Sequence, residues 1–185
     1  MSDPLDDFDA PPLVDPNAWG TPNWLVEIAR RAMGGIDLDP CTSEADQAII
    51  RASTYYTGTQ AGGTDGLVAP WHGRIWLNPP YGRGQIGPWV DRAMWALDHE
   101  EIDSMLVLVN TSSSTKWYHK LLRKCDTVAL LNSRLRFRHP LTGEECAGNR
   151  YDQSMFLFAN SQPEATIRSL ETCLRGKAAT LIPAP

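Results

Sequence analysis

The sequence lacks the cysteine pattern of a zinc site and of a disulfide-bonded scaffold. It contains four cysteines, at positions 41, 125, 146 and 173, which are widely spaced and form no C-x-x-C pair. Structural zinc sites usually need such pairs, and small secreted domains need a regular set of cysteines. We therefore expect reduced thiols and no bound metal.

The sequence also lacks a membrane segment. No apolar stretch approaches the roughly 20 residues that a membrane-spanning helix needs. The N-terminus has no basic residues followed by an apolar run, which is the pattern of a secretory signal. We therefore expect a cytoplasmic protein without membrane contact. Its length of 185 residues and its hydrophobic content of 42% fit one globular domain.

Basic charge is scarce in the chain as a whole, since the formal net charge is −5. The excess acid is concentrated in residues 1–16, which hold five aspartates and four prolines but no lysine or arginine. Without those aspartates, acidic and basic residues balance. We expect residues 1–16 to be a disordered acidic tail, residues 17–178 to form one domain, and residues 179–185 to be a C-terminal tail.

One stretch of the neutral remainder is strongly basic. Residues 116–138 contain seven lysines and arginines, and Asp126 is the only acidic residue among them. Such a cluster is a candidate surface for nucleic-acid phosphates. The structural alternative is a solvated helix face followed by a charged strand.

Helical and strand patterns alternate along the chain. Thr21-Pro22 reads as a helix start, with Pro22 at the first helical position, and Gly34-Gly35 as its end. Further helices are expected around residues 89–97, 115–124 and 163–174, and strands at 36–39, 74–78, 105–109, 127–131 and 154–159, with an extended segment at 134–138. The alternation predicts an α/β fold, a mostly parallel sheet with helices on both faces. The glycine-rich loop at 58–66 has neither a Walker lysine nor G-x-G-x-x-G, so it does not indicate a P-loop or a nicotinamide site.

The tetrapeptide Asn78-Pro79-Pro80-Tyr81 directly follows a predicted strand. An asparagine oxygen can accept a hydrogen bond from a planar amino group, and proline leaves nearby carbonyls without a competing N–H. Tyrosine adds a flat ring on which a base can stack. The tetrapeptide therefore suits methyl transfer to a planar amino nitrogen, although it could also be a turn that ends a strand.

A second polar motif, from Asp37 to Pro40, ends another predicted strand. Ligands of open α/β sheets bind beyond the carboxyl ends of the strands. The alternation of Asp37 and Asp39 places both carboxylates on the same side of the strand. Two polar motifs at neighbouring strand ends can hold two reactants side by side, as a group transfer requires.

From about Trp19 to about Phe158, the chain resembles the phage and prophage (Dam-like) family of DNA N6-adenine methyltransferases. The segments that carry the resemblance are Thr21-Pro22, residues 37–41, Asp65-Gly66-Leu67 with Trp71 nearby, residues 76–82, Thr115-Lys116-Trp117 and residues 134–137. The resemblance implies a class I methyltransferase fold, S-adenosylmethionine as cofactor and DNA as partner. No oligomeric state is indicated, and a monomer is compatible with the sequence.

The resemblance also implies roles for individual residues. Asn78, Pro79, Pro80 and Tyr81 would be catalytic. The cofactor would be held by Thr21, Pro22, Asp37, Asp39, Pro40, Cys41 and Asp65, with Asp65 accepting from its adenine amino group. For Asp37 and Asp39 the structural alternative is capping of a strand end, and for Asp65 it is an Asx turn. The glycine-rich turn that usually follows the first strand of such enzymes is absent.

DNA contacts would come from Lys116, Trp117, Arg134, Arg136 and Phe137. A second aromatic ring should cover the other face of the target base, and the candidates are Phe137, Trp117 and Trp71. Methylation of RNA adenine or of a protein glutamine amide is an alternative with the same chemistry. A catalytically silent DNA-binding module is an alternative of another class.

Overall fold

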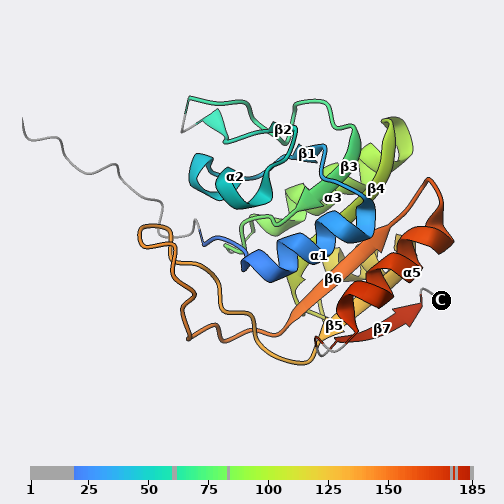
Figure 1. Cartoon of the computed structure of the whole chain (residues 1–185). Helices are drawn as coiled ribbons and strands as arrows, with labels where there is room; N and C mark the ends of the chain where they lie inside the picture. Colours follow the sequence, from blue (N-terminus) through green and yellow to red (C-terminus); the bar gives the residue numbers. More distant parts are fainter. Residues whose placement is uncertain (1–18, 60–61, 83, 176, 178, 184–185) are drawn as a thin grey trace, which may run out of the picture.

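The structure is a computed structural model that describes residues 19–183, apart from positions 60, 61, 83, 176 and 178. The tail predicted for residues 1–16 therefore lies outside the described residues. Within the described part, five helices and seven strands alternate along the chain (Figure 1). None of these helices is long and apolar enough to span a bilayer.

The helices cover both faces of a central sheet, as the sequence predicts. Their bounds are α1 (Asn23–Met33), α2 (Glu44–Ile50), α3 (Ile86–His99), α4 (Lys116–Lys124) and α5 (Pro163–Leu174). In the view of Figure 1, α1 and α5 lie in front of the sheet and α3 lies behind it. The strands are β1 (Leu38–Asp39), β2 (Thr54–Tyr55), β3 (Gly73–Leu77), β4 (Ile102–Asn110), β5 (Thr127–Leu131), β6 (Gln153–Phe158) and β7 (Ala179–Pro183).

The seven strands form one sheet in the order β2-β1-β3-β4-β6-β5-β7. The pairs β1–β2, β1–β3 and β3–β4 are parallel, whereas β6 is antiparallel to both β4 and β5, and β7 is antiparallel to β5. Five strands thus run in one direction, and only β6 and β7 run the other way. The predicted α/β class with a mostly parallel sheet is confirmed.

Alternating side chains of the central strands build two cores, one on each face of the sheet. On β3, Ile75 and Leu77 pack toward α3 and α4, while Trp76 packs toward α1 and α5. All three are fully buried. Burying an apolar side chain of this size contributes roughly 1.5–3 kcal/mol, so the central strands are held firmly from both sides.

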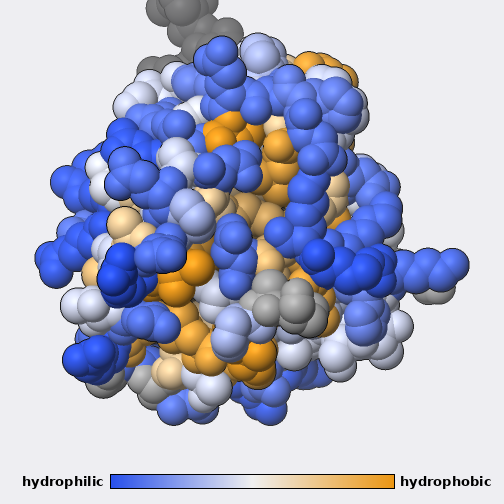
Figure 2. Space-filling view, turned by 90° about the vertical axis from the view of Figure 1, so that its right-hand side faces the viewer, coloured by the Kyte–Doolittle hydropathy of each residue, from blue (hydrophilic) through white to orange (hydrophobic). Residues whose placement is uncertain are grey.

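The face that carries α5 and the C-terminal end of the described chain is mostly hydrophilic. Figure 2 shows this face, where apolar side chains appear mainly in the gaps between charged and polar ones. The loop between β5 and β6, coloured yellow to orange, and α2 lie on the other side of the molecule, at the left of Figure 1.

Several sequence predictions need correction. The helix start is shifted by one residue, because Pro22 is the N-cap of α1 and Thr21 makes no cap bond to it. Residues 179–185 were expected to be a tail, but β7 within them pairs with β5 at the edge of the sheet. The extended segment expected at residues 134–138 joins the sheet at no point among the described residues, and Arg138 makes isolated bridges, to Gly20 and Glu145. The short elements α2 and β2 were not predicted, because neither is long enough to show a periodic pattern.

Candidate active site

The carboxyl ends of β1, β3 and β4 meet at one edge of the sheet, where a pocket of about 710 Å³ opens. Its volume lies in the range of roughly 300–1,000 Å³ that is usual for small-molecule sites. Asp39 ends β1, Asn78 follows β3, and Asn110 ends β4; all three line the pocket. The two predicted polar motifs are therefore at neighbouring strand ends, because β1 pairs with β3. Among the described residues, no group of three or more His, Cys, Asp or Glu side chains could hold a metal ion.

Two hydrogen bonds determine which way the side-chain amide of Asn78 points. Its Nδ2 donates to Thr21 Oγ1 at 3.1 Å, and its Oδ1 accepts from the Tyr81 hydroxyl at 2.5 Å. Burial raises the pKa of Tyr81, so this hydroxyl stays protonated and remains a donor. An amide oxygen has two lone pairs, so Asn78 Oδ1 can accept a second hydrogen bond from a ligand.

Phe137 brings a second aromatic ring to the pocket. Its ring centroid lies 6.4 Å from that of Tyr81, with the two planes at 65°. The other candidates for this position lie elsewhere: Trp71 is buried and stacks on Trp89, and Trp117 packs edge-on against Tyr118 in the same core. Neither Trp71 nor Trp117 lines the pocket. Of the three predicted aromatics, only Phe137 is therefore placed beside Tyr81.

Asp39 is a buried carboxylate in the wall of the pocket, with 1% of its surface exposed. Its oxygens accept from the Cys41 backbone N–H and from Gln47 Nε2, both at 3.2 Å. Asp39 takes part in none of the ion pairs formed among the described residues. Burial raises the pKa of Asp39 to about 7. A cationic ligand in the pocket would provide the positively charged partner that the Asp39 carboxylate lacks among the described residues.

Asp37 lies at the amino end of β1, away from the pocket, so the prediction that it shares a site with Asp39 is wrong. Arg74, at the start of β3, donates to both of its carboxylate oxygens at 2.7 Å. These bonds hold the pKa of Asp37 below its usual value. The Asp37 carboxylate is therefore bound by Arg74, and this contact connects the start of β1 with the start of β3.

The remaining predicted cofactor residues are divided between the pocket and its surroundings. Thr21 and Cys41 line the pocket, whereas Pro22, Pro40 and Asp65 do not. Pro40 is buried, and Asp65 forms an Asx turn in which Oδ1 accepts from the Leu67 N–H at 2.9 Å. The Asx turn is the structural alternative that the sequence had left open.

The basic stretch at residues 116–138 is partly neutralised by acidic residues elsewhere in the fold. The four ion pairs are Lys120–Asp91, Lys124–Asp98, Arg134–Asp152 and Arg138–Asp46. Lys116 and Arg136 are exposed and form no ion pair with the described residues. None of Lys116, Trp117, Arg134 and Arg136 lines the pocket. Four of the seven basic side chains in the stretch are thus paired with a carboxylate, and the phosphate-binding surface expected at residues 116–138 stays a prediction.

Sequence reasoning missed the rim of the pocket. Residues 146–151, in the loop between β5 and β6, line the pocket together with Trp19. Tyr151 is 60% exposed and Trp19 is 40% exposed, which is unusual for large aromatic side chains. The loop is folded back by Asn149, whose Nδ2 donates to the Leu135 carbonyl at 3.3 Å. The loop has no periodic pattern that could have placed it at the pocket. The sequence feature that could have indicated the rim was the presence of Trp19 and Tyr151 in otherwise polar segments.

Comparisons with known proteins agree on one family. The family model of DNA N-6-adenine-methyltransferase (Dam) matches residues 12–177. A DNA N-6-adenine-methyltransferase of Haemophilus phage HP1 (strain HP1c1) is 31% identical over 159 residues, which cover 84% of this chain and 86% of that protein. A DNA N-6-adenine-methyltransferase of Escherichia phage T1 is 26% identical over 140 residues, 74% of this chain and 50% of that protein. No solved structure matches the chain significantly.

We predict that Asp39 makes the stability of the ligand-free protein depend on pH. Its folded-state pKa of about 7 exceeds the value of about 3.9 for an unfolded aspartate. The folded protein therefore holds an extra proton between these values, and its unfolding free energy should fall as pH rises through this window. Asp39→Asn should remove that part of the dependence and raise the Tm at pH 8. Parallel Tm curves for the two proteins from pH 4 to 8 would contradict the prediction.

We also predict that Asp37 stabilises the fold. Asp37→Asn should lower the unfolding free energy by about 2 kcal/mol, because a carboxylate held by two charge-assisted hydrogen bonds is replaced by a neutral amide. Denaturant titration at pH 7 measures this change. As a control, Asp98→Asn removes the exposed carboxylate that pairs with Lys124 and should change stability much less. Equal effects of the two substitutions would contradict a structural role for Asp37.

Proposed function

The chain belongs to the Dam family of DNA N-6-adenine-methyltransferases, and we propose that the pocket at the ends of β1, β3 and β4 binds the methyl donor beside the target adenine. The protein is a DNA adenine N6-methyltransferase. The observation that carries the proposal is the position of Asn78 and Tyr81 in the same pocket as Asp39, a carboxylate that forms no ion pair within the described part of the chain. This arrangement provides one subsite for a planar amino group and one for a cation.

The donor in this proposal is S-adenosylmethionine, which supplies a methyl group made electrophilic by its sulfonium. The chemistry of the pocket fits it, because the buried Asp39 can accept from the ammonium of its methionine part. Thr21 and Cys41 line the same region. The first turn of α1 begins two residues after Thr21 and has backbone N–H groups without helical partners, which suit a carboxylate. Pro22 and Pro40 are the sequence neighbours of Thr21 and Cys41. Burial raises the pKa of the Cys41 thiol, and Asp65 lies near enough for its charge to raise that pKa further. Asp65 keeps its proposed role toward the adenine of the donor.

The acceptor subsite is built by Asn78 and the residues that follow it. Asn78 Oδ1 and the Pro79 carbonyl accept the two hydrogens of the adenine amino group. Pro79 and Pro80 have no N–H to compete for these oxygens. Both hydrogen bonds favour a nitrogen whose lone pair is less conjugated with the ring and therefore more nucleophilic. S-adenosylmethionine would supply the methyl group from its sulfonium and would leave as the neutral thioether, which keeps the electron pair of the broken carbon–sulfur bond. The amino nitrogen would gain the methyl group and lose one proton to solvent, so no side-chain nucleophile is needed.

The target base is held between aromatic side chains. Tyr81 offers its ring to one face of the base, and its hydroxyl keeps Asn78 oriented. Phe137 approaches the same space from the loop after β5. An adenine inside a duplex cannot reach a pocket, so the base is extruded or the substrate is single-stranded.

The DNA backbone is bound around the rim. Lys116, Arg134 and Arg136 are exposed and can meet phosphates, and Trp117 lies beside Lys116 on α4. The pocket-lining residues Arg150 and Tyr151 add a cation and an exposed aromatic ring at the mouth itself. Arginine and aromatic side chains together are the usual contacts for an unstacked strand.

We predict that Asn78→Ala lowers turnover by roughly 100-fold or more, because the variant loses an acceptor aimed at the reacting amino group. Affinity for S-adenosylmethionine should change little. Labelled methyl transfer to DNA measures the first quantity and calorimetry measures the second. Asn160→Ala is a suitable control, because Asn160 follows β6 and is not among the pocket-lining residues. Near-normal turnover of Asn78→Ala would exclude the proposed role, and a wild-type protein that binds no donor would exclude the donor subsite.

The substrate is tested by offering unmodified DNA, RNA and protein in parallel with labelled donor. Label should enter DNA and be recovered as N6-methyladenine. Methylation of RNA adenine or of a glutamine amide uses the same chemistry, but the names of both phage relatives favour DNA. Label found only in RNA or protein would contradict the assignment. DNA binding without any methyl product would favour a silent binding module.

A further inference from the structure

A nearly buried ion pair between Arg138 and Asp46 joins the two halves of the pocket. We propose that Arg138 is a positioning residue for methyl transfer, which holds Asn78 and Phe137 in place relative to the donor subsite. This inference rests on the proposed function, because it assigns donor and acceptor to those halves. It also changes the role of Arg138, which the sequence had placed among the candidate phosphate contacts.

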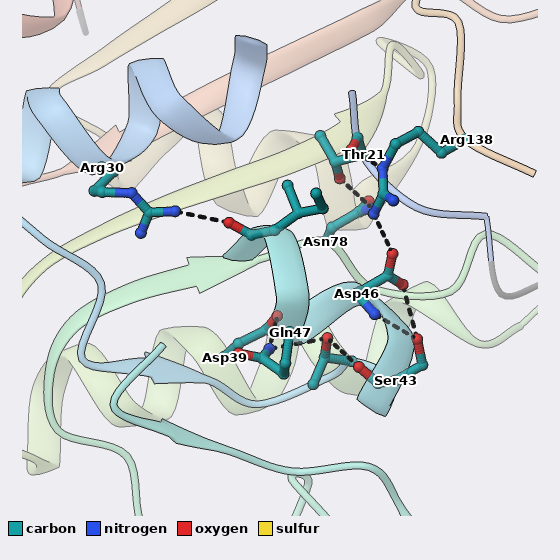
Figure 3. A network of polar contacts seen from close by, with 10 residues as sticks. Thr21, Arg30, Asp39, Ser43, Asp46, Gln47, Asn78 and Arg138 are labelled. Carbon is teal, nitrogen blue, oxygen red and sulfur yellow. Dashed lines mark hydrogen bonds and ion pairs between the residues drawn. The ribbon is translucent and has the colours of Figure 1, made fainter. Parts of the chain in front are cut away.

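The guanidinium of Arg138 bonds in two directions at once (Figure 3). Its Nη2 donates to Asp46 Oδ1 at 2.6 Å, and its Nε donates to the Thr21 carbonyl at 3.0 Å. The two side chains of the pair are only 13% and 17% exposed. Arginine is suited to this position because its donors form a rigid fork, whereas lysine carries one point charge.

The backbone strengthens the same connection. The Gly20 N–H donates to the Arg138 carbonyl at 3.0 Å, and the Arg138 N–H donates to the Gly20 carbonyl at 2.7 Å. A Cβ on Gly20 would lie 2.3 Å from Asp46 Oδ1 and 2.6 Å from Arg138 Nη2. The ion pair thus occupies the space that a side chain at position 20 would fill. A residue with a Cβ at position 20 would force the side chain of Asp46 or Arg138 to move.

On the acceptor side, the connection leads to Asn78 and Phe137. Arg138 holds the backbone of Thr21, and Thr21 Oγ1 accepts from Asn78 Nδ2. Phe137 directly precedes Arg138 in the loop between β5 and β6, so anchoring Arg138 also places its ring near Tyr81. Both contacts that the acceptor subsite needs are therefore adjacent to the ion pair.

On the donor side, the connection leads through α2 to Asp39. Asp46 Oδ2 accepts from Ser43 Oγ at 3.0 Å, and Ser43 caps α2 by accepting from the Asp46 N–H. The next residue, Gln47, donates to Asp39 Oδ2. Thr42 completes the connection, because its Oγ1 donates to the Ser43 carbonyl at 3.4 Å and accepts from Gln47 Nε2 at 3.1 Å, so the chain of contacts in Figure 3 continues from Arg138 to Asp39. The ion pair is the link between this chain and the loop that carries Phe137.

Loss of the pair should therefore impair the alignment of the two reactants more than the binding of either one. A misplacement of about 1 Å can lower a rate by roughly 100-fold. We expect Arg138→Gln to lower kcat by about 10- to 100-fold, and Asp46→Asn to have a similar effect. Affinity for S-adenosylmethionine should stay within about threefold, because Asp39 keeps its other hydrogen bond, from the Cys41 N–H.

The decisive experiment measures kcat and KM on unmodified DNA, the Kd for S-adenosylmethionine and the Tm of four variants. These are Arg138→Gln, Asp46→Asn, the double variant and Gly20→Ala. Since the two side chains act through one contact, the double variant should be no slower than the slower single variant. Gly20→Ala should show the same loss of kcat, because its Cβ separates the pair while both charges remain. Rates are expressed per molecule that binds donor, which removes any unfolded fraction.

A matched control comes from the pair Arg92–Glu100. Its atoms lie 2.9 Å apart, its side chains are 10% and 15% exposed, and it does not line the pocket. Arg92→Gln should lower the Tm and leave kcat unchanged. Should Arg138→Gln not fold, Arg138→Lys replaces it, and its kcat should be intermediate because it keeps the charge and loses the forked geometry.

The proposal is overturned if Arg138→Gln and Gly20→Ala keep kcat within twofold of the wild type, or if Arg92→Gln loses as much kcat as they do. Multiplicative losses in the double variant would also overturn it. Failure of the proposed function is a separate outcome, because the wild-type protein would then transfer no methyl group to DNA.

Discussion

The pocket depends on the requirement that polar groups buried at the edge of a sheet must be satisfied. The Asn78 amide is half-buried, so leaving it without partners would cost part of the about 1–3 kcal/mol that an unbonded, fully buried amide costs. Thr21 satisfies its nitrogen and Tyr81 satisfies its oxygen, so one orientation of the amide is selected. The same requirement explains the Arg138–Asp46 pair. Besides the ion pair itself, Arg138 donates to the Thr21 carbonyl and Asp46 accepts from the Ser43 hydroxyl. Asp39 is the exception, since its hydrogen bonds do not come from a cation, and for this reason we propose it for the donor subsite.

The order of the strands brings these side chains together. β1 and β3 are neighbours in the sheet, although more than thirty positions of sequence separate their ends. Parallel strands place their carboxyl ends at one edge, so Asp39, Asn78 and Asn110 face the same space. The antiparallel strand β6 follows the long loop after β5, and that loop reaches back over the same edge with Phe137 and Tyr151. The pocket therefore combines polar side chains at the strand ends with a rim formed by a loop.

The elements with long periodic patterns could be predicted, and the short or long-range ones could not. The helix at residues 163–174 has the bounds that its apolar spacing indicates, and β4 and β5 lie where apolar runs place them. The strand β7 escaped prediction because its partner β5 is some fifty residues away and its own pattern is short. For the site, Asn78 to Tyr81 and Asp39 could be recognised from their positions after strands. In the sequence, Asp37 and Asp39 looked equally suited to bind a ligand. Asp37 is instead paired with Arg74 on the neighbouring strand, and no local feature of the sequence indicates this partner.

The sequence by itself determined the α/β class and identified Asn78 to Tyr81 as candidates for the chemistry, because helix and strand periodicity and the Asn-Pro-Pro-Tyr segment are local properties. Only the tertiary structure decided which charged residues remain available. Lys120, Lys124 and Arg138 read as one basic surface along the chain, but each meets a carboxylate from another element. The physical reason is that an ion pair depends on distance in space. Distances across the fold are set by strand order and helix packing, which residue spacing along the chain does not encode.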